Sequence, residues 1–220
     1  MTLPRFICLI GPDGSGKSTI ADLLAHKAIE SKIYEDAKVI HHRFNHIPAL
    51  ASLSIFRNIR KLKRSFATET TQKSGNTETS ASPLHRHHWL KTLGYLGYYT
   101  LDYTLGHHVL AELKKHNGIL IGDRYFFDFY IQNHYLALPE FLTDQFLRII
   151  PKPDVLIFLK ATPEKIFIRK HELSLEETRN QNLRCDKLVN RFNGVVIDAD
   201  QPIEQVVGSI WDCLNKDMQI

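Results

Sequence analysis

Short apolar runs alternate along this chain with longer stretches in which apolar residues recur every three or four positions. Brief apolar runs predict buried strands, whereas the longer period predicts amphipathic helices. Five segments fit a strand, and they are Arg5–Ile10, Lys38–His41, Ile119–Gly122, Val155–Leu159 and Val195–Ile197. Because helical segments separate them, the sequence predicts an α/β fold in which a five-stranded parallel sheet is covered by helices on both faces.

The helical segments between these runs differ in length. They are Ser15–Lys32, Pro48–Ser65, Leu84–His116, Asp128–Tyr135, Pro139–Ile149, Pro163–Lys170 and Ile203–Leu214. The longest of them stops at Asn117-Gly118, a pair that is typical of a helix C-terminus. Its aliphatic stripe is predicted to pack in the core, and consists of Leu90, Leu93, Leu101, Leu105, Val109 and Leu113. Its tyrosines are candidates for lining an acceptor pocket, and they are Tyr95, Tyr98, Tyr99 and Tyr103.

Length and composition indicate one globular domain. The chain has 220 residues, of which 43% are hydrophobic and 24% charged, and this balance argues against a disordered or fibrous protein. No apolar run approaches the ~20 residues of a membrane-spanning helix. Three widely spaced cysteines, Cys8, Cys185 and Cys213, favour neither a disulfide framework nor a zinc site. We therefore expect a single cytoplasmic domain over residues 1–220.

Positive charge is concentrated in one part of the chain. Residues 37–101 contain ten lysines and arginines but two acidic residues, whereas the whole chain has a net charge of +4. Such a segment favours an anionic partner. Within it we expect a basic, partly disordered insertion over residues 44–83, because Thr68–Ser82 has no large apolar residue. Residues 50–65 are a candidate for peripheral membrane contact. Nucleic acid is not expected, because aromatic residues do not alternate with the basic ones.

The segment Gly11-Pro12-Asp13-Gly14-Ser15-Gly16-Lys17-Ser18 matches the pattern G-x-x-x-x-G-K-[ST] between a predicted strand and a predicted helix. Glycines in such a loop let backbone N–H groups surround a polyphosphate, and the helix N-terminus adds a positive field. Lys17 is predicted to reach the β- and γ-phosphates, and the Ser18 hydroxyl to bind Mg²⁺. The predicted nucleotide-binding residues are Gly11, Asp13, Gly14, Ser15, Gly16, Lys17, Ser18 and Thr19.

A second group of candidates follows the third predicted strand, as Asp123-Arg124. The carboxyl end of a parallel strand lies at the ligand-binding edge of an open sheet. There Asp123 could hold Mg²⁺ or accept a proton from the attacking oxygen, and Arg124 could neutralise charge on the transferring group. A purely structural ion pair at the strand end is the alternative.

The phosphate loop followed by Thr19, together with a strand that ends in Asp123-Arg124-Tyr125, resembles the thymidylate kinase family of nucleoside monophosphate kinases. The similarity extends to Pro153–Leu159, to Thr162-Pro163-Glu164 and to Ile197–Ala199. It implies a P-loop NTPase-type three-layer fold with a helical lid, with ATP and Mg²⁺ as cofactors. The implied reaction is phosphoryl transfer from ATP to a nucleoside monophosphate such as dTMP.

The resemblance also implies roles for single residues on the acceptor side. Asp13 would contact the acceptor sugar, Arg124 the acceptor phosphate, and Asp102 occupies the position of a family Asp on the long helix. Departures from the family pattern fall on this side. Tyr103 stands where the family has its base-contacting Arg, and Asp128 replaces a small polar residue. The glycine-rich motif after the second strand is His41-His42-Arg43-Phe44-Asn45 here, in which Arg43 is a candidate for the acceptor-phosphate ligand.

Phosphoryl transfer needs water excluded and charge neutralised around the γ-phosphoryl group. A mobile basic lid is predicted over Arg169 and Lys170 and the following stretch His171–Arg184, with Arg169, Arg179 and Arg184 as its candidate arginines. The sequence thus favours a kinase of a small-molecule acceptor, and it is compatible with a homodimer. A sugar or glycan-related acceptor is one alternative. The other is a non-catalytic nucleotide-binding module whose basic insertion binds an anionic partner.

Overall fold

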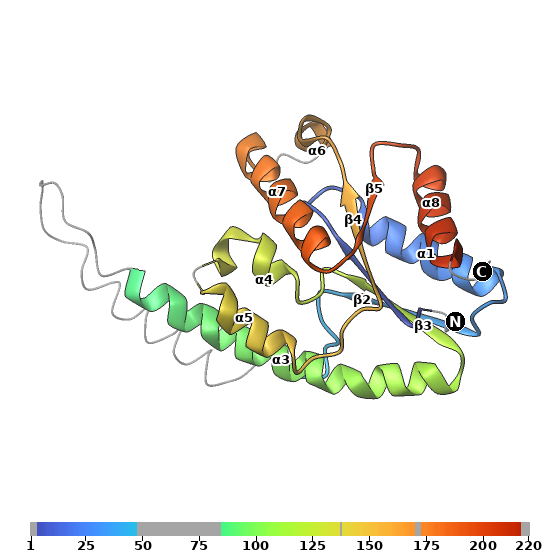
Figure 1. The fold of residues 1–220 in the computed structure, drawn as a ribbon, viewed down its shortest axis with the longest axis horizontal. Coiled ribbons are helices and arrows are strands. Elements are labelled where there is room, and N and C mark those ends of the chain that lie inside the picture. The colour runs from blue at the N-terminus through green and yellow to red at the C-terminus, as the bar shows by residue number, and fades with distance from the viewer. Residues whose placement is uncertain (1–3, 48–84, 137, 170–172, 217–220) are drawn as a thin grey trace, which may run out of the picture.

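The computed structural model describes residues 4–47, 85–136, 138–169 and 173–216 (Figure 1). Its centre is a parallel sheet whose strands lie in the order β2-β3-β1-β4-β5. The strands are β1 (Phe6–Ile10), β2 (Asp36–His41), β3 (Gly118–Asp123), β4 (Val155–Lys160) and β5 (Val195–Asp198). The predicted five-stranded parallel sheet is confirmed, and each strand lies within two residues of its predicted bounds.

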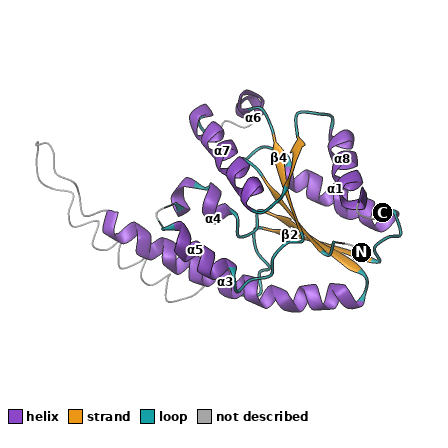
Figure 2. Ribbon diagram, viewed as in Figure 1, coloured by secondary structure: helices purple, strands orange, loops and turns teal. Residues whose placement is uncertain are grey.

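Helices cover both faces of this sheet (Figure 2). One face carries α1 (Lys17–Glu30) and α8 (Ile203–Lys216), and the other carries α3 (His85–Lys115), α4 (Asp128–Ile131), α5 (Glu140–Leu147) and α7 (Leu175–Arg191). The short helices η2 (Asn133–Tyr135) and α6 (Pro163–Arg169) connect these elements. The three-layer α/β/α arrangement is therefore as predicted.

The central strand shows why two helical layers form. All five residues of β1 are buried, and successive side chains point to opposite faces of a strand. Ile7 and Leu9 pack in the cluster that includes α1 and α8. Phe6, Cys8 and Ile10 pack in the cluster that includes α3, α4 and α7. A strand that is apolar on both sides requires a cover on both sides.

The order of the strands brings the phosphate loop to the point where the chain changes direction. After β1 the chain runs to β2 and β3 on one side of the sheet, and then crosses to β4 and β5 on the other. Leu9 and His41 are both in register with Asp123, so the carboxyl ends of β1, β2 and β3 meet. Ligands of open α/β sheets bind at such a switch point.

The long helix α3 packs differently from the prediction. Leu101 and Leu105, expected in the core, are 62% and 44% exposed. Leu96 and Tyr103 are instead fully buried against the sheet. Leu113 is buried as predicted, and Leu93 and Val109 are partly buried. Leu101 and Leu105 therefore lie on the exposed side of α3, contrary to the prediction, whereas Leu93, Val109 and Leu113 turn toward the core. Tyr103 and Leu96 take the space against the sheet that Leu101 and Leu105 were expected to fill.

Several predictions fall on residues outside the described part of the chain. They concern the helix Pro48–Ser65, the loop Thr68–Ser82, most of the basic insertion over residues 44–83, and the membrane-contacting stretch 50–65. Among the residues that the structure does describe, no helix combines the length and hydrophobicity needed to cross a membrane.

Candidate functional site

The loop between β1 and α1 has the backbone geometry of a phosphate cradle. Gly11, Gly14 and Gly16 all have positive φ angles, of 153°, 93° and 88°. At Gly11 a Cβ atom would lie 2.8 Å from both the Leu159 carbonyl oxygen and Ser15 Oγ, so no side chain fits there. Gly16 is the N-cap of α1, and it has no side chain that could cap the helix. The N-terminal end of α1 is therefore not capped by its own N-cap residue and is suited to binding an anion.

Lys17 lies inside this loop. Its Nζ donates hydrogen bonds to the carbonyl oxygens of Gly11 (2.8 Å) and Pro12 (2.7 Å), and the side chain is buried. Burial lowers the pKa of Lys17, as does the nearby Arg124 guanidinium, while the carboxylates of Asp13, Asp128 and Asp123 act in the opposite direction. Three carboxylates and a second cation thus share one electrostatic neighbourhood with the ammonium group.

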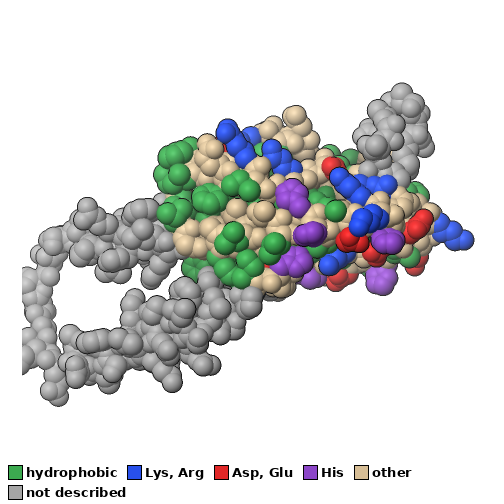
Figure 3. Space-filling model, turned by 90° about the horizontal axis from the view of Figure 1, so that it is seen from below, with side chains coloured by type: hydrophobic (Ala, Val, Ile, Leu, Met, Phe, Trp, Pro, Cys, Tyr) green, Lys and Arg blue, Asp and Glu red, His purple; other side chains and the backbone are tan. Residues whose placement is uncertain are grey.

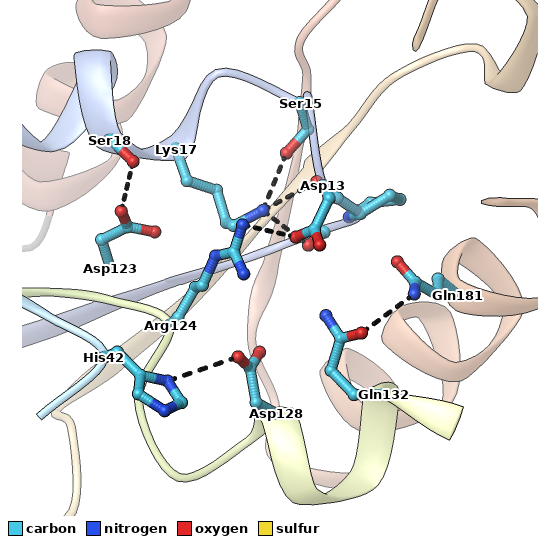
Figure 4. A network of polar contacts seen from close by, with 12 residues as sticks. Asp13, Ser15, Lys17, Ser18, His42, Asp123, Arg124, Asp128, Gln132 and Gln181 are labelled. Atoms are coloured by element: carbon cyan, nitrogen blue, oxygen red, sulfur yellow. Dashed lines mark hydrogen bonds and ion pairs between the residues drawn. The ribbon is translucent and has the colours of Figure 1, made fainter. Parts of the chain in front are cut away.

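Ser18 and Asp123 come together as the sequence predicted. The Ser18 hydroxyl donates a 2.5 Å hydrogen bond to Asp123 Oδ2, which joins the first turn of α1 to the end of β3 (Figure 4). Asp123 is 2% exposed, and its second oxygen, Oδ1, is buried without a hydrogen-bond partner among the described residues. A buried carboxylate oxygen with free acceptor capacity beside a hydroxyl is a donor set that suits Mg²⁺.

The fit to Mg²⁺ is that of a nucleotide-bound ion and not of a protein-only site. Within the described ranges no group of three or more His, Cys, Asp or Glu side chains could hold a metal. Mg²⁺ in nucleotide sites typically takes one or two protein oxygens and completes its shell with phosphates and water. Ser18 and Asp123 are therefore the residues that would hold it.

A histidine that sequence reasoning did not assign completes the surroundings of Asp123. His41 Nδ1 lies 3.1 Å from Asp123 Oδ2, and its Nε2 lies 3.8 Å from Asp22 Oδ1. The parallel pairing of β2 with β3 places His41 opposite Asp123. The sequence places His41 at the end of one predicted strand and Asp123 directly after another. Only the order of the strands in the sheet shows that the two residues are neighbours.

Arg124 and Asp13 form an ion pair at the mouth of the loop. Arg124 Nη2 lies 2.6 Å from Asp13 Oδ1, with both side chains partly exposed. Arg124 has a φ angle of 56°, a left-handed conformation that is unfavourable for a residue with a side chain. This turn directs the guanidinium back from the end of β3 toward Lys17 and Asp13 (Figure 4). The predicted catalytic and nucleotide-binding residues Lys17, Asp123, Arg124 and Asp13 are thus assembled in one place.

On the acceptor side, Asp128 faces His42. Asp128 is the first residue of α4 and is 6% exposed, and its Oδ2 lies 3.7 Å from His42 Nδ1. His42 has a φ angle of 68° and donates its backbone N–H to the Asp123 carbonyl oxygen at 2.7 Å. The Tyr103 hydroxyl donates to the His42 carbonyl oxygen, and the His42 ring meets the Tyr99 ring edge-on at 4.9 Å. His42 is therefore held from several sides.

Asp102 and Tyr103, two predicted acceptor-binding residues, are buried on α3. Both are 0% exposed. The Asp102 carboxylate accepts backbone N–H groups from Asn45 (3.1 Å) and Ile47 (3.0 Å), and the Tyr103 ring lies among buried aromatic rings. These contacts hold the segment after β2 against α3, and the predicted roles of Asp102 and Tyr103 in acceptor binding stay predictions.

Arg43 is also engaged within the protein. Its Nη1 donates to the Tyr98 hydroxyl and to the Ile47 carbonyl oxygen, and its guanidinium lies 5.3 Å from the Tyr98 ring centre. The predicted role of Arg43 as an acceptor-phosphate ligand stays a prediction.

Two buried amides beside the site were missed. Gln132 and Gln181 are 8% and 1% exposed, and Gln181 Nε2 donates to Gln132 Oε1 at 3.2 Å. Gln181 Oε1 is buried and has no hydrogen-bond partner among the described residues. Nothing in the local sequence distinguishes them, since Gln132 lies within the predicted helix Asp128–Tyr135 and Gln181 within the predicted lid.

The predicted lid over His171–Arg184 is largely helix α7, whose Ser174 side chain accepts the Glu177 N–H at 3.1 Å. The Ser-x-x-Glu spacing is a capping-box signal that could have identified this start. Arg179 pairs with Glu164 at 2.7 Å, so it joins α7 to α6.

The two other candidate arginines of the predicted lid, Arg184 and Arg169, have different surroundings. Arg184 donates to the Ile131 carbonyl oxygen at 2.7 Å and to Asn133 Oδ1 at 2.8 Å, which fastens α7 to the end of α4. Arg184 is thus a structural contact in this arrangement. Arg169 is exposed at the C-terminal end of α6, next to residues 170–172, which lie outside the described part of the chain.

A separate groove of about 340 Å³ lies between β2 and the C-terminal half of α3. Its lining includes Asp36, Lys38, His108 and Glu112. Figure 3 views the surface that α3 forms, where histidines gather near acidic and basic side chains. Asp36 is in register with Gly118, at the start of β3, so the groove lies at the opposite end of these strands from Asp123.

No protein-family model and no curated protein sequence matches the chain. Among solved structures, the crystal structure of thymidylate kinase from Ehrlichia chaffeensis is similar to it with a TM-score of 0.57. The match covers 96% of this chain and 98% of that one, at 16% sequence identity. At this identity the likeness concerns the fold, and it extends over nearly the whole length of both chains. The fold class expected from the resemblance in sequence is thereby confirmed.

Proposed function

We propose that this protein is a phosphotransferase that uses Mg²⁺·ATP to phosphorylate a small-molecule acceptor. The observation that carries the proposal is the convergence of Lys17, Ser18, Asp123 and Arg124 at the carboxyl ends of β1 and β3. A phosphate cradle, a metal-binding oxygen pair and a guanidinium are the components that phosphoryl transfer requires. The fold shared with a thymidylate kinase supports the same class of reaction.

Each of these residues has a separate role in phosphoryl transfer, which follows from its position in the site. The N–H groups at the start of α1 and the Lys17 ammonium would bind the phosphates of the nucleotide, because they present fixed positive charge at the loop. Mg²⁺ held by Ser18 and Asp123 would neutralise charge on those phosphates. Arg124, turned toward Lys17 by its left-handed backbone, would stabilise negative charge that develops on the transferring group.

Nucleoside monophosphates are the acceptors that the resemblance predicts, dTMP first. Arg124 supports them, because a guanidinium can bind a phosphate through two parallel hydrogen bonds. In this arrangement its Nη2 already contacts the Asp13 carboxylate. A monophosphate acceptor would therefore have to compete with Asp13 for the same cation.

The proposal is tested by ADP release in the presence of Mg²⁺·ATP and a panel of acceptors. Lys17→Ala is the control, because it removes the ammonium group that the loop places at the phosphates. Acceptor-dependent ADP release by the wild type that Lys17→Ala abolishes would support the proposal. A wild-type protein that binds Mg²⁺·ATP but transfers to nothing would instead support the alternative of a non-catalytic nucleotide-binding module.

A further inference from the structure

We propose that the acceptor is a neutral, polyhydroxylated small molecule, and that Asp128 takes the proton from its attacking hydroxyl group. This inference rests on the phosphoryl transfer proposed above and specifies its substrate class. It starts from the position of Asp128, which is buried at the start of α4 with its carboxylate turned toward His42 and Arg124 (Figure 4). Figure 4 shows Asp128 on the side of the phosphate loop where Asp13, Lys17 and Arg124 meet.

The charges around this space disfavour a phosphorylated acceptor. Besides Asp123, which would hold Mg²⁺, Asp13 and Asp128 contribute two carboxylates beside the cations Lys17 and Arg124. Arg124 is in contact with Asp13 at 2.6 Å. A phosphate monoester brings up to two further negative charges, and a like charge close by raises the free energy of the bound ion. A neutral acceptor avoids this repulsion and leaves Lys17 and Arg124 available to bind the phosphates of the nucleotide.

A general base such as Asp128 is needed only if the attacking atom of the acceptor carries a proton. A phosphate oxygen is already ionised at neutral pH and needs no base, whereas a hydroxyl group must lose its proton as it attacks. In the proposed step the hydroxyl oxygen forms a bond to the γ-phosphorus of ATP. The bond from that phosphorus to the β,γ-bridging oxygen breaks, its electron pair leaves on ADP, and the hydroxyl proton passes to the Asp128 carboxylate.

The surroundings fix Asp128 in place for such a transfer. His42 lies 3.7 Å from its Oδ2, and His42 is itself held by the Asp123 carbonyl oxygen, the Tyr103 hydroxyl and the Tyr99 ring. His42 is a positioning residue in this account. Asp128 is the catalytic residue, because it would contact the reacting hydroxyl.

Neutral hydrogen-bonding groups complete the acceptor surface. Figure 4 shows Gln132 and Gln181 on the same side of the loop as Asp128, with the Gln132 amide nitrogen turned toward the space between Asp13 and Asp128. Gln181 Oε1 is buried and has no partner among the described residues, although buried polar atoms are normally hydrogen-bonded. Amide and carboxylate groups both bond hydroxyls, which donate and accept at once. Together they suit a compound that carries several hydroxyl groups.

The test compares acceptor classes with the full-length protein. ADP release is measured with neutral monosaccharides, with nucleosides, and with the monophosphates of both, so that a free sugar is distinguished from the sugar of a nucleoside. We expect release with a neutral member and none with the monophosphates. Asp128→Asn should lower kcat for that acceptor by about 100-fold or more, the usual contribution of a general base, with little change in KM. Asp212→Asn, on the exposed side of α8, should behave as the wild type.

Binding of a non-hydrolysable ATP analogue with Mg²⁺, measured by calorimetry, separates the two proposals. We expect wild type and Asp128→Asn to bind it equally. Three results would overturn the inference without affecting the proposed nucleotide site. They are ADP release with monophosphates alone, no ADP release with any acceptor of the panel although the analogue binds, and an unchanged kcat in Asp128→Asn. Absence of analogue binding in the wild type would remove the proposed function itself. The panel needs the wild type alone, so it decides the acceptor class even if Asp128→Asn does not fold.

Discussion

The Ser18 hydroxyl donates to Asp123 Oδ2 at 2.5 Å, while Asp123 Oδ1 is buried beside it without a partner among the described residues. This contact links the helix that follows the phosphate loop to the neighbouring strand of the sheet. It places one carboxylate where both a metal ion and the loop can reach it. The chemistry proposed for the protein depends on this geometry more than on any other single contact.

Asp123→Asn should impair phosphoryl transfer because it weakens the binding of Mg²⁺. The amide keeps the shape of the side chain but loses the charge that holds Mg²⁺. We expect turnover to fall by about 10–100-fold or more, with a higher Mg²⁺ concentration needed for half-maximal activity. Asp36→Asn, an exposed carboxylate at the other end of β2, is the matched control. A Mg²⁺ titration of ADP release checks this, and identical titration curves for wild type and Asp123→Asn would contradict it.

Gly11→Ala should destabilise the loop. The new methyl group would lie 2.8 Å from the Leu159 carbonyl oxygen and from Ser15 Oγ, and neither backbone nor the buried serine can move without cost. We expect a loss of about 1–3 kcal/mol in the free energy of unfolding. Gly208→Ala is the control, because no atom of the described residues lies within 4 Å of its added carbon inside α8. It should gain about 1 kcal/mol. Urea denaturation of both variants measures the contrast, and equal effects would refute the steric argument.

Arg124→Gly should separate stability from activity. Glycine accepts the φ angle of 56° without strain, and a non-glycine residue there costs about 1–2 kcal/mol. The partly exposed ion pair with Asp13 is worth about 1 kcal/mol at most. We therefore expect an unchanged or higher melting temperature together with a fall in kcat of about 100-fold or more. A large drop in melting temperature, measured by calorimetry, would show that Arg124 is mainly structural.

The lowered pKa of Asp144 predicts that the protein loses stability in acid. Burial alone would raise the pKa of Asp144, but hydrogen bonds from Arg191 and Tyr130 outweigh it and lower the pKa below its ordinary value of 3.8. A depressed pKa stabilises the fold above the ordinary value, and this contribution is lost as the pH falls through the lower, folded-state pKa. We expect Asp144→Asn to cost about 0.5–1 kcal/mol at pH 7, since the pair is partly exposed.

The pH dependence of that difference is the decisive feature. Urea denaturation at pH 7 and at pH 3 should show the gap between wild type and Asp144→Asn narrowing at the lower pH. A gap that is constant across this range would mean that the charge of Asp144 is not what stabilises the contact between α5 and α7.

The phosphate loop and the strand ends could be predicted because they depend on local sequence. Glycine spacing between an apolar run and an amphipathic helix determines the loop, and the buried strand before Asp123 places it at the carboxyl edge of a parallel sheet. Ser18 and Asp123 could each be named as a candidate Mg²⁺ ligand from these two facts. The contact between them depends on the pairing of β1 with β3, which only the structure shows.

The acceptor side could not be predicted because it depends on packing between distant elements. The face that α3 turns to the sheet is set in part by the fit of Tyr103 and Leu96 in the core, and the spacing of leucines indicated only part of that face. The resemblance assigns Asp102 to acceptor binding, but it gave no sign that the Asp102 carboxylate accepts backbone N–H groups 55 and 57 residues away. Such contacts appear only once the segment after β2 is placed against α3.

Every step proposed for this protein requires that the loop before α1 bind Mg²⁺·ATP. Isothermal titration calorimetry of the full-length protein with Mg²⁺ and a non-hydrolysable ATP analogue measures this binding, with Lys17→Ala alongside. We expect saturable binding by the wild type and an affinity lower by about tenfold or more in Lys17→Ala, the loss expected for a hydrogen bond to a charged group. No heat of binding from the folded wild-type protein, or equal affinities for both proteins, would contradict it.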